Sequence, residues 1–445
     1  MSMFLRGTLL LIVATFLGEC VEFIVNMVLA KELGERGLGL YMSILPTVFL
    51  IVLLASFELP ISISKFIAEK EDKYHKSMLQ HVIRLTIIFT AVLLILASIA
   101  MPLIPTFDQY HPLFRWLVVL LIPMISFSSI ARGFFMGKQQ MSKIASAHFL
   151  RKILQLALLV VLFQLFEFDM STSILIAFCT FVGSEFVIVI YLIHMFYIQF
   201  QQLKHRPSEF ITSKNVRQNL MAVSIPTTGL RIFHSLTHAI QPFLIKIALV
   251  HSGLSEGIAT EQFGMLAGVA MTIGFFPAFI AHSLLIMLIP TVSKAYADRD
   301  LFKLQKILQQ VMGITFLYGV PAVMVFYFFA EPLTNMFFHS SVAANFLQLL
   351  WPYFLLHFFV IPMQAYLIGL GLMKDAFYHT LWSHVIQFSL MYFLGSMHDF
   401  QMDGVIIGMN TGAVLLTLMH YMTICKKIGV SSISLRRLSN ENIRV

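Results

Sequence analysis

Charged residues are scarce in this sequence. Asp, Glu, Lys and Arg make up 12% of its 445 residues, whereas hydrophobic residues make up 58% and the mean hydropathy is +0.84. A soluble globular chain carries about twice this charged fraction, so the composition excludes an ordinary soluble protein. The net charge is +8, yet no basic block alternates with stacking aromatic residues. The positive charge is therefore assigned to orientation in a membrane, and no nucleic-acid partner is expected.

Cysteine is also scarce, with Cys20, Cys179 and Cys425 far apart in or beside apolar segments. This spacing excludes a disulfide framework and a cysteine zinc site, and no metal or other cofactor is expected. The N-terminus superficially resembles a signal peptide, with Arg6 before an apolar stretch, but it lacks a small-residue cleavage site. We expect it to be an uncleaved first helix.

Long apolar runs occupy most of the chain. The run from Gln262 to Ser293 contains no Asp, Glu, Lys or Arg, and about 20 apolar residues suffice for a helix to cross a bilayer. Pro277 indicates that this helix bends. Twelve such runs predict membrane-spanning helices at 5–30, 38–63, 80–102, 113–132, 145–166, 172–197, 217–249, 263–289, 308–330, 346–369, 376–397 and 403–424. With the N-terminus inside, most Lys and Arg residues fall in inner loops, which predicts that both termini are cytoplasmic.

Two motifs recur about half a chain length apart. Ser64-Lys65-Phe66-Ile67-Ala68-Glu69 is matched by Ser293-Lys294-Ala295-Tyr296-Ala297-Asp298, and Met136-Gly137 is matched by Ile368-Gly369. Six spans in each half predict an all-α fold of two six-helix lobes, related by a pseudo-two-fold axis along the membrane normal, with a substrate site between them. The expected organisation is an N-terminal lobe at 1–200, a cytoplasmic linker at 201–216, a C-terminal lobe at 217–424 and a basic cytoplasmic tail at 425–445.

Polar residues recur at helical spacing on the first helix of each predicted lobe. The first helix carries Thr15, Glu19, Glu22 and Asn26, and the seventh carries Thr227, Arg231, His234, His238 and Gln241. Because charge inside a membrane is costly, we interpret the two stripes as facing one central cavity, where Glu19 and Glu22 pair with Arg231. The alternative for the first stripe is interhelical hydrogen bonding between protonated carboxyl groups. His234 and His238 have metal-ligand spacing but no third ligand, so no metal is expected.

Further charges lie within or beside the other spans. Glu58 and Arg84, near cytoplasmic ends of helices, are candidates for gating pairs or for substrate contact. Glu185 is a candidate coupling site or the acceptor of a hydrogen bond within its own lobe. Lys246 is a further candidate for coupling or for interfacial snorkelling. Arg151 and Lys152 are interpreted as anchors to lipid headgroups. A membrane-spanning segment tolerates such charges only where they have a structural or functional role.

Four segments carry a resemblance to a known family. They are the loop Leu29–Tyr41, the segment Leu59–Lys65, Arg132-Gly133-Phe134-Phe135-Met136-Gly137, and the stretch Ala259–Lys294. Together they resemble the stage V sporulation protein B-like branch of the multidrug/oligosaccharidyl-lipid/polysaccharide (MOP) exporter superfamily. The resemblance implies twelve helices in two lobes and a flippase for lipid-linked cell-envelope precursors. Better-known lipid flippases of this superfamily carry arginines along the first two helices, where this chain has Glu19, Glu22 and Glu58.

Two functions on this fold compete. The first is alternating-access flipping of an anionic lipid-linked glycan precursor in a bacterial cell membrane, with sporulation implied by the resemblance alone. The second is proton- or sodium-coupled export of small organic cations, for which intramembrane carboxylates are suited. A membrane-embedded glycan-processing enzyme is disfavoured because the outer loops are short. The expected partners are membrane lipid, the substrate and a coupling cation or the membrane potential, and the chain is expected to be monomeric.

Overall fold

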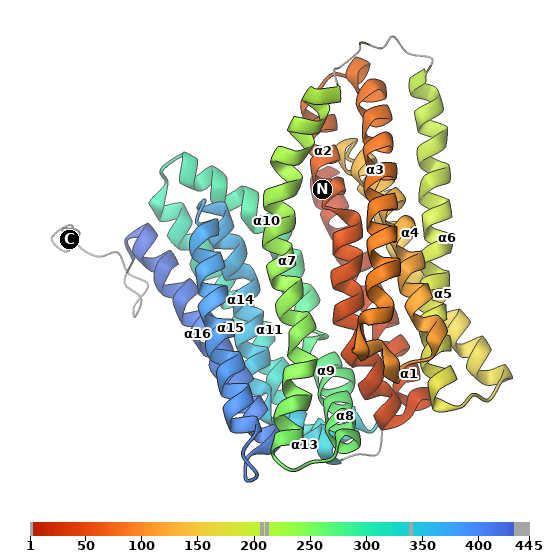
Figure 1. The fold of residues 1–445 in the computed structure, drawn as a ribbon. Coiled ribbons are helices and arrows are strands. Elements are labelled where there is room, and N and C mark those ends of the chain that lie inside the picture. Colours follow the sequence, from red (N-terminus) through yellow and green to blue (C-terminus); the bar gives the residue numbers. More distant parts are fainter. Residues whose placement is uncertain (1–2, 205–208, 210–212, 338–340, 431–445) are drawn as a thin grey trace. The chain divides into compact units, whose positions relative to one another are not determined.

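The computed structural model describes residues 3–204, 209, 213–337 and 341–430, and these are almost entirely helical (Figure 1). The first half contains α1 (Met3–Ser56), α2 (Leu59–Glu69), α3 (Asp72–Ala100), η1 (Met101–Leu103), η2 (Pro105–Gln109), α4 (Pro112–Gly137), α5 (Met141–Leu165) and α6 (Met170–Lys204). The second contains α7 (Ser213–His251), α8 (Glu256–Gly264), a π-helix (Met265–Ala270), α9 (Met271–Phe275), α10 (Ala278–Ala297), α11 (Leu301–Phe328), α12 (Ala330–Thr334), α13 (Ser341–Leu349), α14 (Trp351–Gly369), α15 (Met373–Gly395) and α16 (Gln401–Ile428). Residues 205–208 and 210–212 of the predicted linker, and the predicted tail from residue 431 onward, lie outside the described residues.

Eleven helices of the described chain are long and apolar enough to cross a membrane. One of them runs from Phe16 to Glu69 and contains two predicted spans, which meet at Gly34, where φ is 66° and ψ is 176°. Glu256–Phe275 and Ala278–Ala297 count as two helices, although the sequence predicts one bent span there. The eleventh predicted span, 376–397, corresponds to α15, which is less apolar and is not among the eleven helices. The all-α polytopic fold is confirmed, and the helices are consistent with the twelve-span, two-lobe arrangement.

The chain forms two compact units. The N unit comprises Cys20–Ile240, and the C unit comprises the residues up to Glu19 and from Gln241 onward. This division differs from the predicted lobes, because it falls inside α1 and inside α7 rather than in the linker. Glu19 consequently belongs to the C unit, whereas Arg231 belongs to the N unit together with Glu22.

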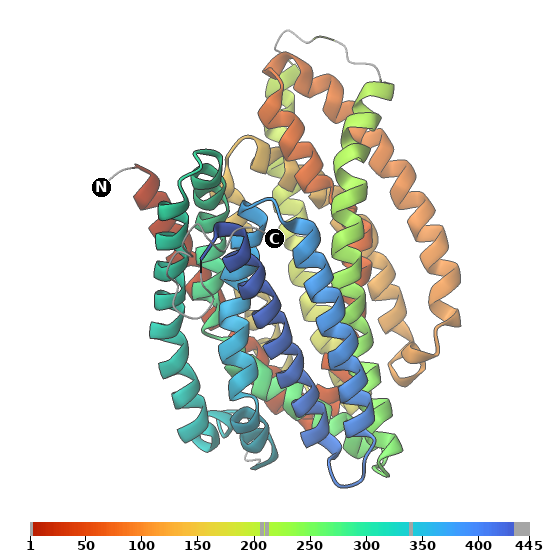
Figure 2. The same cartoon turned by 90° about the vertical axis from the view of Figure 1, so that its left-hand side faces the viewer.

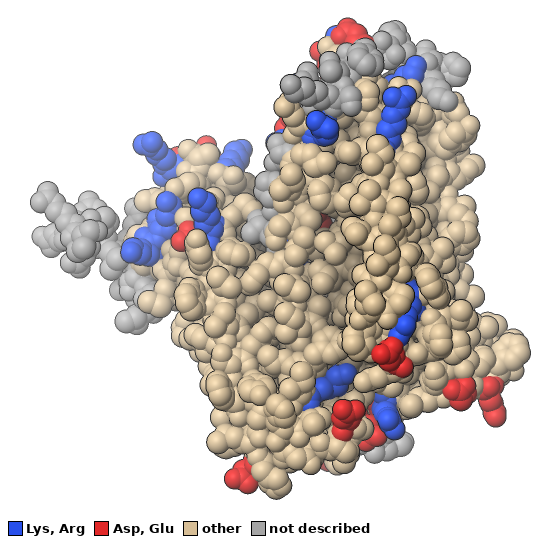
Figure 3. Space-filling view, in the orientation of Figure 1, with Lys and Arg blue, Asp and Glu red and all other residues tan. Residues whose placement is uncertain are grey.

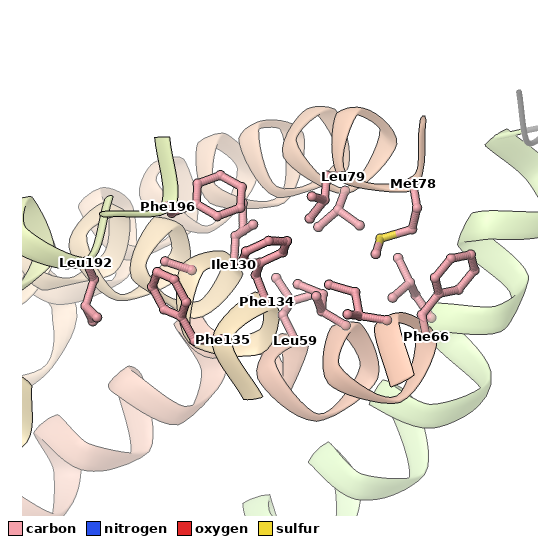
Figure 4. Packing of buried hydrophobic residues seen from close by; sticks show 14 of the residues in the cluster. Leu59, Phe66, Met78, Leu79, Ile130, Phe134, Phe135, Leu192 and Phe196 are labelled. Atoms are coloured by element: carbon pink, nitrogen blue, oxygen red, sulfur yellow. The ribbon is translucent and has the colours of Figure 1, made fainter. Parts of the chain in front are cut away.

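Aromatic and aliphatic side chains build the core of the N unit where α2, α3, α4 and α6 meet (Figure 4). Phe134 of α4 packs edge-on against Phe196 of α6, with ring centroids 5.4 Å apart. Met78 and Leu79 of α3 complete the cluster, and both are fully buried. On the face of this unit that Figure 3 shows, charged side chains gather towards the helix ends and leave an apolar band between them, as a bilayer requires.

Glycines set the closest helix contacts in both units. A Cβ atom at Gly133 of α4 would lie 2.8 Å from Ile63 Cβ and 3.0 Å from Pro60 Cα, so α4 touches the backbone of α2. In the C unit, a Cβ atom at Gly369 of α14 would lie 2.8 Å from Val292 Cβ and 3.1 Å from the Ile289 carbonyl oxygen. Small residues allow this approach between membrane helices.

Helix breaks shape the C unit. The predicted bend is confirmed, because α9 ends at Phe275 and α10 begins directly after Pro277. A π-helix at Met265–Ala270 precedes the bend, and such insertions often occur at functional positions. The long helices α15 and α16 run side by side in both ribbon views (Figures 1 and 2).

Candidate functional site

The candidate site is built on a sharp break between α1 and α2. Phe57 and Glu58 both have positive φ, 45° and 48°, a conformation that non-glycine residues rarely adopt. Pro60 then occupies the first turn of α2, where its fixed φ favours a helix start. The Phe57 ring packs on Phe89 of α3, with centroids 4.9 Å apart. Backbone strain that is held in place by packing is a feature of functional sites.

The break presents the Glu58 carboxylate to α7. Arg231 Nη1 lies 2.7 Å from Glu58 Oε1, within charge-assisted hydrogen-bond distance. The Glu58 side chain is 4% exposed, whereas the Arg231 side chain is 62% exposed. One turn further along α2, the hydroxyl groups of Ser62 and Ser224 share a buried hydrogen bond of 2.6 Å. These two polar contacts join α2 to α7 within the N unit.

The Arg231–Glu58 pair lies inside the membrane-spanning part of the unit. α2 and α4 run in the same direction, because Gly133 contacts Ile63 and Gly137 contacts Ile67. Gly137 ends α4, and the helical rise of about 1.5 Å per residue puts Glu58 roughly 13 Å inward from Ile67. An exposed guanidinium at such a depth is costly unless it faces water or an anionic partner.

A second set of ion pairs joins four helices of the same unit. Arg132 Nη2 of α4 donates a hydrogen bond to Glu185 Oε1 of α6 at 2.6 Å, and Arg151 Nε of α5 lies 3.7 Å from Glu185 Oε2. Lys152 Nζ lies 3.6 Å from Glu22 Oε2 of α1. Arg132, Arg151 and Lys152 thus face the carboxylates of Glu185 and Glu22.

The structure assigns new partners to several predicted site residues. Glu22 pairs with Lys152 and Arg231 pairs with Glu58, so both differ from the predicted pairing of Glu22 with Arg231. Arg151 and Lys152 were expected at lipid headgroups. This is wrong in the structure, because their side chains are 16% and 17% exposed and point at carboxylates of the same unit.

The remaining predicted residues are dispersed. Glu19 and Asn26 are partly buried on α1, and Arg84 is exposed on α3. On α7, His234 is partly buried, with its ring against Phe233, and His238 is exposed. Lys246, in the C unit, lies 5.5 Å from the centroid of the Phe243 ring. Sequence reasoning had not selected Arg132, although a lone arginine in an apolar span together with Glu185 in another span gave a usable signal.

An all-helical membrane fold with ion pairs set along its spanning helices is typical of a membrane transporter. A family profile described as polysaccharide biosynthesis protein matches residues 4–294, and a second, MatE, matches residues 266–393. The chain therefore belongs to the polysaccharide biosynthesis protein family, within the MOP exporter superfamily. The expected family is confirmed.

Curated relatives match nearly the full chain. It is 55% identical over 431 residues to sporulation protein YkvU of Bacillus subtilis (strain 168), covering 97% of each protein. It is 32% identical to stage V sporulation protein B of that organism, covering 96% of this chain and 85% of the relative. Identity to its lipid II flippase MurJ is 21%, covering 97% and 84%.

Solved structures share the fold. A multidrug resistance MATE family transporter of the MOP superfamily, in an inward-facing conformation, matches with a TM-score of 0.71 and 17% identity, covering 92% of this chain and 94% of the other. A MOP superfamily transporter from Pyrococcus furiosus gives a TM-score of 0.66 at 16% identity, covering 95% of each chain. Together these comparisons establish a multi-pass membrane transporter.

Proposed function

We propose that the protein is an alternating-access flippase for an anionic lipid-linked precursor of the cell envelope, and that Arg231 receives the headgroup. The observation that carries this proposal is the guanidinium of Arg231, which is 62% exposed within the spanning part of the N unit and paired with Glu58. Arginine binds phosphate with paired, planar hydrogen bonds. A phosphate of the headgroup competes with the Glu58 carboxylate for the same donors.

Transport follows from a difference in partner between two states. With Glu58 as its partner, Arg231 ties α7 to α2; with a phosphate as its partner, this tie is released. A ligand shifts a conformational equilibrium only through such a differential interaction. The names of the relatives support the substrate class and the setting, since one is a lipid II flippase and two are sporulation proteins.

A vesicle assay tests the proposal. The purified protein is reconstituted into liposomes containing a polyprenyl-diphosphate-linked glycan with a fluorescent headgroup, and an impermeant quencher measures its movement between leaflets. We expect movement with the native chain and a loss of at least tenfold for Arg231→Gln. Arg217→Gln removes an exposed arginine near the start of the same helix, α7, and serves as the matched control. Equal movement in liposomes with and without the native protein would contradict the proposed function.

The second candidate is coupled export of small organic cations. It is favoured by the partly exposed carboxylate of Glu22, which is 37% exposed beside Lys152. The same liposomes, loaded with ethidium and given a proton or sodium gradient, distinguish the two functions. Gradient-driven ethidium movement that Glu22→Gln abolishes, without movement of the lipid, would select the exporter.

The proposal includes an orientation with both termini in the cytoplasm. Positively charged inner loops support this orientation. Arg115, at the outer start of α4, departs from this bias, but it is paired with Asp108 of η2, so its charge is neutralised there. Reporter fusions at Glu167, Glu256 and Asp399 should lie outside. A cytoplasmic signal at any two of them would reverse the orientation.

A further inference from the structure

The two side chains of the Arg231–Glu58 ion pair differ in exposure and in conformational freedom. Arg231 carries a long side chain that is mostly exposed, so its guanidinium reaches another anion by changing rotamers. Glu58 is 4% exposed and is held on a strained turn between two helices. Its carboxylate therefore stays in place when the arginine leaves.

Hydroxyl groups and charged side chains surround the break that carries Glu58. The Ser62 hydroxyl donates to the Glu58 backbone carbonyl oxygen and shares a hydrogen bond with Ser224. The titratable or charged groups on α2, α3, α4 and α7, which pack around this break, include Lys65, Glu69, His81, Arg84, Arg132, Arg217, Arg231 and His234. Lys65 lies 3.9 Å from Glu69, and Arg132 is bound to Glu185. Among the described residues, Glu58 forms its ion pair with Arg231.

A buried carboxylate without a counter-ion is strongly disfavoured, and such groups become neutral by binding a proton. We propose that Glu58 binds one proton each time a phosphate-bearing lipid headgroup takes Arg231, so that substrate and proton bind together. This inference rests on the proposed function and adds a coupling ion to it. The carboxylate and one proton form a neutral carboxyl group, and the arginine keeps its charge throughout. The negative charge of the phosphate takes the place of the Glu58 carboxylate as the counter-charge of Arg231.

Joint binding of a proton and the anion predicts how the affinity for the anion changes with pH. Because a proton is taken up with the anion, the affinity for the anion falls as pH rises, by up to tenfold per pH unit where Glu58 of the free protein is ionised. Simple competition without a proton gives an affinity that does not depend on pH in that range. The ligand must be fully ionised, which holds at pH 8 because the second phosphate ionisation lies near pH 6.

Isothermal titration calorimetry measures the proton directly. The full chain in detergent is titrated with farnesyl diphosphate at pH 8 in two buffers of different ionisation enthalpy, which yields the number of protons taken up per anion bound. We expect about one proton for the native protein and about zero for Glu58→Gln, which keeps the side-chain shape and binds at least as tightly. Glu69→Gln, which removes an exposed carboxylate of the same helix, should behave as the native protein. Arg231→Gln should bind at least tenfold more weakly.

The outcomes separate the inference from the proposed function. Anion binding that requires Arg231 but takes up no proton would overturn the inference without contradicting the proposed flippase function. Binding that is unaffected by Arg231→Gln would overturn both the inference and the assigned headgroup site. If Glu58→Gln does not fold, the native protein alone decides, through its affinity at pH 8, 8.5 and 9: a constant affinity overturns the inference and a progressive fall supports it.

Discussion

Neutralising Glu185 should destabilise the N unit far more than neutralising an exposed carboxylate. The carboxylate of Glu185 is 7% exposed and faces two guanidinium groups, those of Arg132 and Arg151, which are 21% and 16% exposed. Glu185→Gln keeps the size of the side chain and removes its charge. The two arginines then face each other from α4 and α5 with no anion between them.

The exposed fractions determine the expected magnitude. Removing one partner of a buried ion pair costs about 3–5 kcal/mol, because the remaining charge is left uncompensated. The matched control, Glu69→Gln, removes a carboxylate that is 59% exposed and 3.9 Å from Lys65. Exposed pairs of this kind contribute about 0–1 kcal/mol. The expected difference between the two variants is therefore about 3 kcal/mol.

The assay is reversible unfolding by sodium dodecyl sulfate in mixed micelles, followed by circular dichroism. Adding Arg151→Gln to Glu185→Gln removes one of the two facing cations and should recover part of the lost unfolding free energy, by about 1–3 kcal/mol. Equal unfolding free energies for Glu185→Gln and Glu69→Gln would refute the reasoning. So would a double variant that is less stable than Glu185→Gln alone.

Three further outcomes follow from local geometry. Gly137→Ala should lower the unfolding free energy by about 1–3 kcal/mol, because the new Cβ would lie 2.6 Å from Ile67 Cβ. Gly313→Ala adds a Cβ with no atom within 4 Å and should raise the unfolding free energy by up to about 1 kcal/mol, because alanine favours the helix. The pKa of Asp169 is lowered, chiefly by a hydrogen bond from the Thr172 hydroxyl, so the ionised carboxylate stabilises the folded state. Asp169→Ala should therefore lower the melting temperature at pH 6. The difference from the native protein should vanish as the pH falls below about 4 and through the lowered pKa, because the carboxylate of the native protein is then protonated. Ser224→Ala breaks the buried hydroxyl pair and should cost about 1 kcal/mol in the same unfolding assay.

Apolar length made the fold predictable. Spans such as 113–132 and 145–166 fall within α4 and largely within α5, because about 20 apolar residues must be helical to satisfy their backbone in a bilayer. The division into units was not predictable in this way. It falls inside α1 and α7, and nothing in the apolar pattern of one long helix shows which of its turns pack with which neighbours.

The partners of the charged residues were less predictable still. Helical periodicity placed Glu22 and Arg231 on plausible faces, but a period within one helix does not specify the helix that lies opposite. Glu58 reaches Arg231 because Phe57 and Glu58 adopt positive φ and break the helix there. The sequence has no glycine at these positions that would have predicted this turn. Lys152 reaches Glu22 through packing of α5 that the sequence alone does not reveal.

The glycine contacts also correct the register of the internal repeat. Matching Lys65 with Lys294 aligns Pro60 with Ile289 and Ile63 with Val292. Pro60 and Ile63 contact Gly133 in the first half, and Ile289 and Val292 contact Gly369 in the second half. Gly133, rather than Gly137, is therefore the structural counterpart of Gly369, one helical turn from the match made on sequence.

The same register carries a chemical consequence. It aligns Glu58 with Met287, which bears no charge. The two halves thus share a way of packing their helices, since small residues at fixed positions let backbones meet. The acid that faces Arg231 belongs to the first half alone. Each half thus contributes a different group to the site: the first half supplies Glu58, which binds the proton, and the second half supplies Arg231, which binds the anion. Because the acid is not repeated, a single proton per anion is the stoichiometry expected of the proposed site.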